Sequence, residues 1–209
     1  MTNSEIAWSP SSEVAFVTQT SESEVDRLVD DGMLPSRFCK RSQRREFDLV
    51  GTSVSVTINH DLKHLLTRNA RKVAIETWME SHYSVLLAEY QLPGKTISDD
   101  VVTAVSSFDM GTLSVNLEDS MGRMANRLKK ILQVHETVIC DPEILGGLPV
   151  IRGSRLPIES LLATVDEGVP FDIIQDDYPF LTPEMIEHAR LYQQTHPRRG
   201  RPRRSEQPE

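Results

Sequence analysis

The chain has 209 residues, of which 38% are hydrophobic, 26% are charged and 6% are aromatic, and its formal net charge is −8. This composition favours helical modules joined by polar segments, and the length suits one large domain or two small ones. No apolar run approaches the ~20 residues that cross a bilayer, and the first twenty residues lack the features of a secretory signal. The two cysteines, Cys39 and Cys140, are far apart, so we expect a reducing, cytoplasmic environment and no membrane partner.

The charge is unevenly distributed along the chain. Residues 197–209 hold five arginines and two glutamates, a charge of +3, so the remainder of the chain carries −11. An acidic body with a basic tail predicts that the tail seeks an acidic partner, either a nucleic acid or an acidic protein cleft.

Two short helices are predicted after a flexible leader at residues 1–10. The first covers residues 13–19, and the second can be capped by Ser21 or Ser23 and stopped by Gly32. The apolar side chains of the second helix recur at helical spacing: Val25, Leu28 and Val29. Two short helices around a tight polar turn outline a helix-turn-helix.

A basic run follows this helix pair, and it predicts contact with DNA phosphates, with the option of forming a wing. Its cations are Arg37, Lys40, Arg41, Arg44 and Arg45. The second helix, however, carries five acids beside its one arginine: Glu22, Glu24, Asp26, Asp30 and Asp31. Either Ser21, Ser23 and Arg27 read bases while the acids turn away, or the helix is a packing or dimerising element.

The middle of the chain mixes strand and helix patterns. Residues 52–58 alternate apolar and polar side chains and predict a strand, although neighbours can draw them into a helix, and residues 112–117 predict a second strand. Helical spacing runs from Asp61 to about His82, before a break at Pro93-Gly94. The clearest helix covers residues 118–135. Its apolar stripe serves either packing within one chain or a homodimer, which would match a two-fold operator.

Residues 138–196 predict a compact C-terminal domain with a short strand at Val150-Ile151 and three helices. The helices are expected from Pro157 to about Glu167, over 171–176, and from a Thr182 cap to about Gln194. The fold class is therefore mainly α with short β elements, in the order leader 1–10, helix-turn-helix-like region 11–117, connecting helix 118–137, C-terminal domain 138–196 and tail 197–209. The tail composition predicts disorder in the free protein.

No catalytic or metal-binding constellation is evident. The six histidines are scattered, and neither a glycine-rich phosphate loop nor a nucleophile elbow is present. His60 and His64 are four residues apart, but no third ligand is indicated. We therefore expect a protein that is not an enzyme and that needs neither a metal nor another cofactor.

The sharpest motif lies in the C-terminal domain and carries a family resemblance. Residues 141–157 read D-P-E-I-L-G-G-L-P-V-I-R-G-S-R-L-P, followed by D-Y-P-F-L at 177–181 and A-R-L-Y at 189–192. This pattern resembles a widespread bacterial domain of unknown function whose helices are winged or homeodomain-like. With the tail H-P-R-R-G-R-P-R-R at 196–204, the chain resembles VapB-type antitoxins.

This resemblance implies a PIN-domain-like ribonuclease toxin, encoded by a neighbouring gene, as partner, and repression of the pair's own operon through operator DNA. PIN-type nucleases hold a divalent metal with clustered carboxylates, and a guanidinium placed among them would displace metal and substrate. The alternative is a generic basic tail over nucleic acid. The predicted toxin-binding residues are Arg152, Arg155, Tyr178, Phe180, Tyr192, Arg198, Arg199, Arg201, Arg203 and Arg204.

Two of these predictions have alternatives. Arg152 and Arg155 either bind an anion or brace the hairpin against local carboxylates such as Asp141 or Asp177. Tyr178 and Phe180 belong either to the core or to the surface that faces the toxin. The preferred hypothesis is an antitoxin that forms a homodimer or hetero-oligomer, and the alternative is a stand-alone DNA-binding transcriptional regulator.

Overall fold

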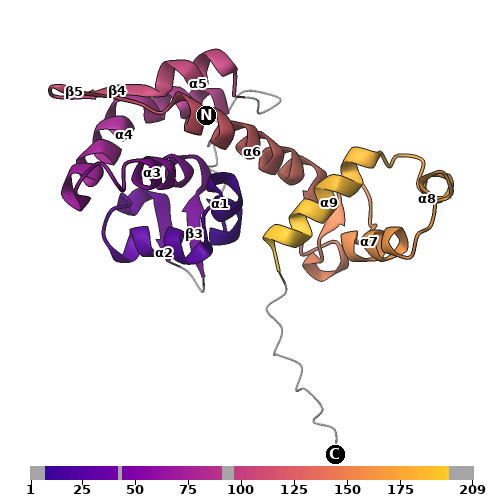
Figure 1. Ribbon diagram of the computed structural model, residues 1–209. Helices are drawn as coiled ribbons and strands as arrows, with labels where there is room; N and C mark the ends of the chain where they lie inside the picture. The colour runs from indigo at the N-terminus through magenta and orange to yellow at the C-terminus, as the bar shows by residue number, and fades with distance from the viewer. Residues whose placement is uncertain (1–7, 42–43, 91–96, 198–209) are drawn as a thin grey trace, which may run out of the picture.

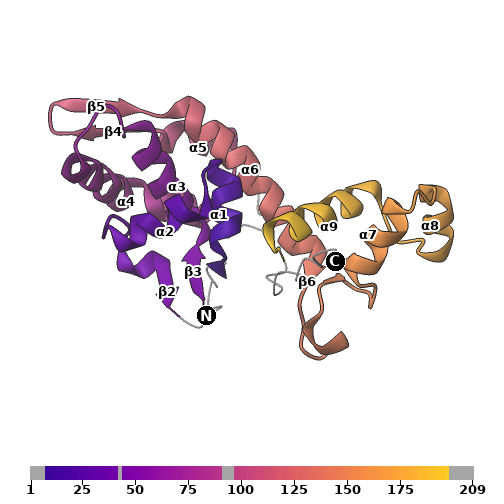
Figure 2. The same ribbon diagram turned by 60° about the horizontal axis from the view of Figure 1, so that its bottom comes forward.

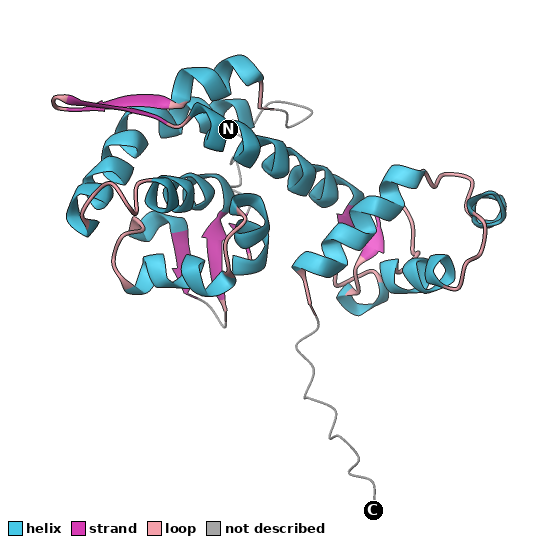
Figure 3. Ribbon diagram, viewed as in Figure 1, coloured by secondary structure: helices cyan, strands magenta, loops and turns pink. Residues whose placement is uncertain are grey.

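A computed structural model describes residues 8–41, 44–90 and 97–197, and these residues form a mainly helical protein, as predicted (Figures 1 and 3). The chain builds a larger N-terminal body and a smaller C-terminal domain, with the long helix α6 running from one to the other (Figure 1). No helix among these residues is both long enough and apolar enough to cross a membrane.

The predicted helix pair opens the N-terminal body. The first two helices are α1 (Ser11–Thr18) and α2 (Glu22–Asp30). Ser21 caps α2 in a capping box: its side chain accepts a hydrogen bond from the Glu24 backbone N–H, and the Glu24 side chain accepts one from the Ser21 N–H. Val25 and Leu28 are buried against the core, so the apolar spacing of α2 orients the helix.

A three-stranded antiparallel sheet accompanies this pair. Its strands are β1 (Trp8–Ser9), β2 (Cys39–Arg41) and β3 (Arg45–Asp48), in the order β1-β3-β2. β2 and β3 form a hairpin in the basic run, with Cys39 opposite Phe47 and Arg41 opposite Arg45. Two helices followed by a hairpin is the order of elements expected if the basic run forms a wing beside the helix pair.

The strand predicted at residues 52–58 is wrong, because these residues lie in α3 (Leu49–Asp61). The Asp48 carboxylate caps this helix by accepting a hydrogen bond from the Gly51 N–H at 2.7 Å. The hydroxyls of Ser55 and Thr57 donate to carbonyls one turn earlier, so they need no solvent. Every residue from Leu49 to Ile58 is buried. The polar and the apolar side chains of this segment are therefore equally buried. For that reason the alternation of polar and apolar residues does not indicate a strand here.

The next elements cover α3 and extend the body. They are α4 (Arg68–Tyr90), α5 (Asp99–Val105), β4 (Ser107–Met110) and β5 (Leu113–Asn116). The helix expected from Asp61 begins at Arg68 instead, since α3 already extends to Asp61. Buried Trp78 joins α4 to α5 by donating a 2.7 Å hydrogen bond to the Val105 carbonyl. The strand predicted over 112–117 is confirmed as β5, paired with β4.

The helix α6 (Glu118–Thr137) confirms the clearest helix prediction. Its apolar stripe is buried within this chain, in the same core as α1, α3 and α4. The stripe comprises Met121, Met124, Ala125, Leu128, Ile131 and Leu132. Packing within one chain therefore accounts for the stripe, and a second chain is not needed to cover it.

The C-terminal domain has its own core beyond α6. The strands β6 (Val138–Ile139) and β7 (Val150–Ile151) pair antiparallel. Three helices follow, α7 (Ile158–Asp166), α8 (Phe171–Asp177) and α9 (Pro183–Thr195). Their bounds match the predictions, except that Pro157 is the N-cap of α7 rather than its first residue. Buried side chains of the hairpin and all three helices form the core: Val138, Ile151, Leu156, Ile158, Leu161, Leu162, Ile174, Leu181, Ile186 and Ala189.

Candidate functional site

The outward face of α2 carries the residues predicted to read bases. Ser21, Ser23 and Arg27 are exposed, while Val25 and Leu28 point inward. The Ser21 hydroxyl is already engaged in the cap and lies 3.0 Å from the Ser23 hydroxyl. Ser23 and Arg27 are four residues apart, so both lie on the same side of the helix.

The acids of α2 are paired with groups of the same chain. Arg45 donates to the Asp26 carboxylate at 3.2 Å and to the Asp30 carboxylate at 2.5 Å. This hydrogen bond from Arg45 lowers the pKa of Asp30. Glu22 accepts from the Ser11 hydroxyl at 2.8 Å, and Asp31 pairs with Arg68 at 3.5 Å. The acidic side chains of α2 would disfavour contact with a DNA groove, but most of them are paired with other groups of this chain.

The predicted phosphate-binding cations separate into two groups. Arg45 bridges α2 and β3 through the contacts just described. The other four, Arg37, Lys40, Arg41 and Arg44, are exposed. Aromatic rings support two of them: the Lys40 ammonium lies 3.8 Å from the centre of the Trp8 ring, and the Arg37 guanidinium lies 4.8 Å from the Phe38 ring.

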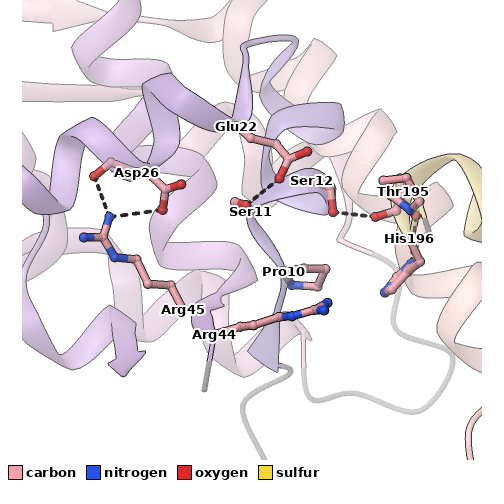
Figure 4. Close-up of a pocket in the computed structure, with 10 residues that line it drawn as sticks. Pro10, Ser11, Ser12, Glu22, Asp26, Arg44, Arg45, Thr195 and His196 are labelled. Carbon is pink, nitrogen blue, oxygen red and sulfur yellow. Dashed lines mark hydrogen bonds and ion pairs between the residues drawn. The ribbon is translucent and has the colours of Figure 1, made fainter. Parts of the chain in front are cut away.

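A cleft of about 390 Å³ separates the helix pair from the end of α9 (Figure 4). Its lining residues come from the start of α1, the outer side of α2, the beginning of β3 and the end of α9: Pro10, Ser11, Ser12, Glu22, Asp26, Arg44, Arg45, Thr195, His196 and Pro197. The Ser12 hydroxyl donates to the Thr195 carbonyl across it. This cleft brings the start of the arginine tail beside the candidate DNA-binding elements.

A buried carboxylate joins three helices next to this cleft. The side chain of Glu13, on α1, is fully buried, and its two oxygens lie 2.8 and 3.0 Å from Nε2 of His135, on α6. Nε2 of His196, after α9, lies 3.7 Å from the same carboxylate. Burial lowers the pKa of His196, an effect that Glu13 partly opposes. No local pattern in the sequence indicates this cluster, because its members come from distant segments of the chain.

Arg152 braces the fold, but not against a carboxylate as expected. Its side chain donates to the carbonyls of Glu136 at 2.6 Å and His135 at 2.8 Å, and its backbone N–H donates to the Thr137 carbonyl at 2.7 Å. The Val138 N–H donates a hydrogen bond to the Val134 carbonyl. The last four carbonyls of α6 are thus all satisfied. Arg155 is exposed and makes no hydrogen bond or ion pair among the described residues.

The aromatic residues of the predicted toxin-binding set lie in two places. Tyr178 and Phe180 follow α8, are 37% and 44% exposed, and pack edge to face with ring centres 6.2 Å apart. They belong to the surface, while neighbouring Leu181 is buried. Tyr192 is half-buried on α9, with its hydroxyl 3.0 Å from the Cys140 sulfur and its ring stacked on His196. Burial raises the pKa of Tyr192.

Other predictions concern residues that the structure does not cover. Arg198, Arg199, Arg201, Arg203 and Arg204 lie outside the described residues, as does most of the predicted leader. Among the residues that are described, no three His, Cys, Asp or Glu side chains are placed to hold a metal ion. The expectation that the protein is not an enzyme stays a prediction.

Comparison with known proteins identifies relatives but no activity. Residues 138–192 match the family DUF433, described as a protein of unknown function. The uncharacterized protein y4eO of Sinorhizobium fredii is 30% identical over 192 residues, which cover 92% of this chain and 83% of that protein. The crystal structure of Rv2018 from Mycobacterium tuberculosis is similar over 86% of this chain and 95% of that one, at 15% identity and a TM-score of 0.41. The identity and coverage show that the chain belongs to the same protein family as y4eO, with a DUF433 domain at its C-terminal end.

Proposed function

We propose that this protein is a DNA-binding antitoxin, which represses its own operon through the N-terminal helix pair and hairpin and binds a ribonuclease toxin through its C-terminal domain. One observation carries the proposal. The helix α2 lies beside the β2–β3 hairpin (Figure 2), and Arg45 of β3 is bonded to Asp26 and Asp30 of α2. A helix with a flanking cationic hairpin is an arrangement that enters a major groove and holds the adjacent backbone.

The side chains suit these two roles differently. Arg27 can donate two parallel hydrogen bonds to the edge of a guanine, and the Ser23 hydroxyl can donate to or accept from a base. Arg41 and Arg44, near the hairpin turn, would contact phosphates. Arg45 holds Asp26 and Asp30, so its role in this proposal is to offset the negative charge of α2 near the duplex.

The surface proposed for the toxin lies at the other end of the molecule. Ile173, Tyr178 and Phe180 are all more than a third exposed, and exposed carboxylates adjoin them at Asp172, Asp176 and Asp177. Residues 138–197 contain ten acids and three arginines, a charge of −7. Exposed aromatic residues are the side chains that most often anchor a protein interface. We therefore propose that the toxin presents a basic, partly apolar surface to α8.

DNA binding is tested by fluorescence anisotropy with duplexes tiled across the region upstream of the gene. Arg27→Ala should weaken binding to the best duplex by about 5- to 150-fold, the range expected for a base contact. Arg41→Ala should weaken binding to all duplexes alike and reduce the slope of affinity against salt by about 1. Arg155→Ala is the matched control, because it removes an exposed arginine from the other domain. Equal affinity for all four proteins would refute DNA binding by this face.

Toxin binding is tested by co-expression with the product of the neighbouring gene. The full chain should form a stoichiometric complex and silence ribonuclease activity, and Phe180→Ala together with Tyr178→Ala should weaken the complex. Glu159→Gln, at an exposed position on α7, is the control for a general change in charge. If DNA binding is present but no complex forms, the protein is a stand-alone regulator.

A further inference from the structure

A small cavity lined by cations lies between α2 and the turn that joins α3 to α4, residues 62–67. Its volume is about 120 Å³. The basic and amide side chains around it come from α2, the last turn of α3, the α3–α4 turn and the start of α4: Arg27, Asn59, His60, Lys63 and Arg71. Lys63 is exposed and Arg71 is half-buried. The cavity therefore extends the polar surface around Arg27 beyond α2 itself.

The α3–α4 turn is fixed against α2 by contacts at the end of that helix. The Arg68 guanidinium, in the first residue of α4, donates to the carbonyl of Asp31 and pairs with its carboxylate at 3.5 Å. Hydrogen bonds from Ser21 lower the pKa of Glu24, and the positive charge of Lys63 lowers it further. Lys63 therefore lies close enough to α2 to act on one of its side chains.

The hairpin and the α3–α4 turn lie on opposite sides of the exposed strip of α2. The hairpin is bonded to Asp26 and Asp30, which are one helical turn apart. The α3–α4 turn lies beside Glu24 and Asp31, which are two helical turns apart. At about 100° per residue, Arg27 lies between these two pairs of acids. The proposed base-reading strip is therefore bordered by cations on both sides.

Arg71 is held in place by neutral groups, so its charge is available to a ligand. Its Nε donates to the Asn59 side-chain oxygen at 2.8 Å, and its Nη1 donates to the Leu66 carbonyl at 2.7 Å. Among the described residues its Nη2 donates no hydrogen bond and no carboxylate pairs with it. A guanidinium fixed in this way beside the ammonium of Lys63 is suited to the oxygens of a phosphate group.

The two carboxylates that line the cavity are already engaged. Glu24 accepts a hydrogen bond from the Ser21 N–H at 3.0 Å as part of the capping box, and Asp31 is paired with Arg68. The lining holds three cations beside these two acids. Because one of the acids is neutralised by Arg68, positive charge predominates around the cavity.

We propose that Lys63 and Arg71 bind a phosphate of the DNA backbone, on the side of α2 opposite the hairpin. The inference rests on the proposed DNA binding and deepens it by naming a second backbone contact. A major groove is about 12 Å wide, and an α-helix with its side chains is about 10–12 Å across. When α2 lies in the groove, each of its two sides therefore faces one of the two sugar-phosphate backbones.

This second contact has a consequence for recognition. Phosphate contacts fix the register and orientation of a protein on the duplex, while base contacts specify the sequence. The hairpin and the α3–α4 turn together would hold α2 from both backbones. Arg27 would then be kept centred over the base edges that it is proposed to read.

The experiment measures DNA binding by the full chain and its Lys63→Ala, Arg41→Ala and Lys130→Ala variants at several salt concentrations. Lys63 is chosen because it is exposed, whereas Arg71 also supports the turn. Lys130, an exposed lysine of α6 outside the cavity, is the matched control. Lys63→Ala should reduce the slope of log affinity against log salt by about 1. From about 50 to about 200 mM salt, the wild type should therefore lose about threefold more affinity than Lys63→Ala.

Methylphosphonate substitution, which removes the charge of one phosphate at a time, locates the contact. Wild-type binding should be weakened by substitutions on both backbones that border the groove. Lys63→Ala should become insensitive to substitution of one phosphate, and Arg41→Ala should become insensitive to substitution of a phosphate on the other backbone. Lys130→Ala should respond as the wild type does.

The outcomes separate this inference from the function on which it rests. If the wild type binds DNA and Arg41→Ala reduces the salt slope, but Lys63→Ala behaves like Lys130→Ala, the second contact is refuted and the proposed function stands. If Lys63→Ala reduces the slope but stays sensitive to every methylphosphonate, a defined phosphate contact is refuted. If inorganic phosphate raises the melting temperature of the wild type but not of Lys63→Ala, and DNA binding is the same for both, the cavity binds a small anion and the inference is overturned. Failure of the wild type to bind any duplex would overturn both proposals.

Discussion

Arg152 should be a structural residue of the junction between α6 and the C-terminal domain, and Arg152→Ala tests this. The change removes hydrogen bonds to the carbonyls of His135 and Glu136, which are the ends of helical C=O groups with no intrahelical partner. It also removes a cation from the negative end of the α6 dipole. The backbone hydrogen bond from residue 152 to Thr137 should remain, so the β6–β7 hairpin should still form.

The size of the effect follows from the exposure of the site. A hydrogen bond from a charged group contributes about 1.5–3 kcal/mol when it is shielded. Arg152 is exposed, so water can replace it at both carbonyls, and we expect a total loss of about 1–2 kcal/mol. For a chain of this length that loss corresponds to a melting temperature lower by about 2–8 °C. Arg152→Lys should recover part of it, since lysine restores the charge without the two-pronged geometry.

The assay is thermal and urea unfolding of the wild type, Arg152→Ala, Arg152→Lys and Arg155→Ala. Arg155 is the matched control, because it is an exposed arginine three residues away with no hydrogen bond among the described residues, and its loss should cost less than about 0.5 kcal/mol. If Arg152→Ala unfolds like Arg155→Ala, the capping argument is wrong.

Three further predictions concern other parts of the structure. Glu13→Gln should lower the free energy of unfolding by about 2–3 kcal/mol, because the buried carboxylate that contacts His135 is lost. Glu46→Gln, at an exposed position of β3, is the control, and equal unfolding midpoints would contradict the role of Glu13. Gly51→Ala should destabilise by about 1–3 kcal/mol, because its Cβ would lie 2.7 Å from buried Phe38. Gly122→Ala on α6, with no atom within 4 Å of the new Cβ, should instead raise the free energy of unfolding by up to about 1 kcal/mol. If both substitutions changed the free energy of unfolding in the same direction, the steric argument would be refuted. Burial lowers the pKa of both His188 and His196 below the ordinary 6.5, so the unfolded chain binds more protons and stability should fall as pH drops below about 6.5. Urea midpoints at pH 7.5 and 6.0 measure this, and the fall should be smaller in His196→Gln; a midpoint that rises on acidification would contradict the sign.

Local signals in the sequence were sufficient for some of the helix boundaries. Thr182 caps α9 as predicted, and Ser21, one of the two residues predicted as caps, caps α2, because a cap acts on backbone groups two or three residues away. By contrast, α1 begins at Ser11 rather than near Glu13. The spacing of Val25 and Leu28 is also a local signal: these two residues face the core, so Ser23 and Arg27 lie on the outer side of α2. The mainly helical class and the long helix α6 also followed from spacing alone.

Only the tertiary structure decided the features that depend on distant residues. Residues 52–58 form a helix because α3 is enclosed by protein on every side, so burial overrides their alternating pattern. Arg152 contacts the end of α6, which lies 16 residues earlier in the chain. His196 lies beside Glu13, which is more than 100 residues away in the sequence. The same packing brings the start of the arginine tail to the α2 side. The sequence supplies the charges and the caps, but which charges become neighbours depends on how the helices pack, because no local spacing encodes a contact between distant segments.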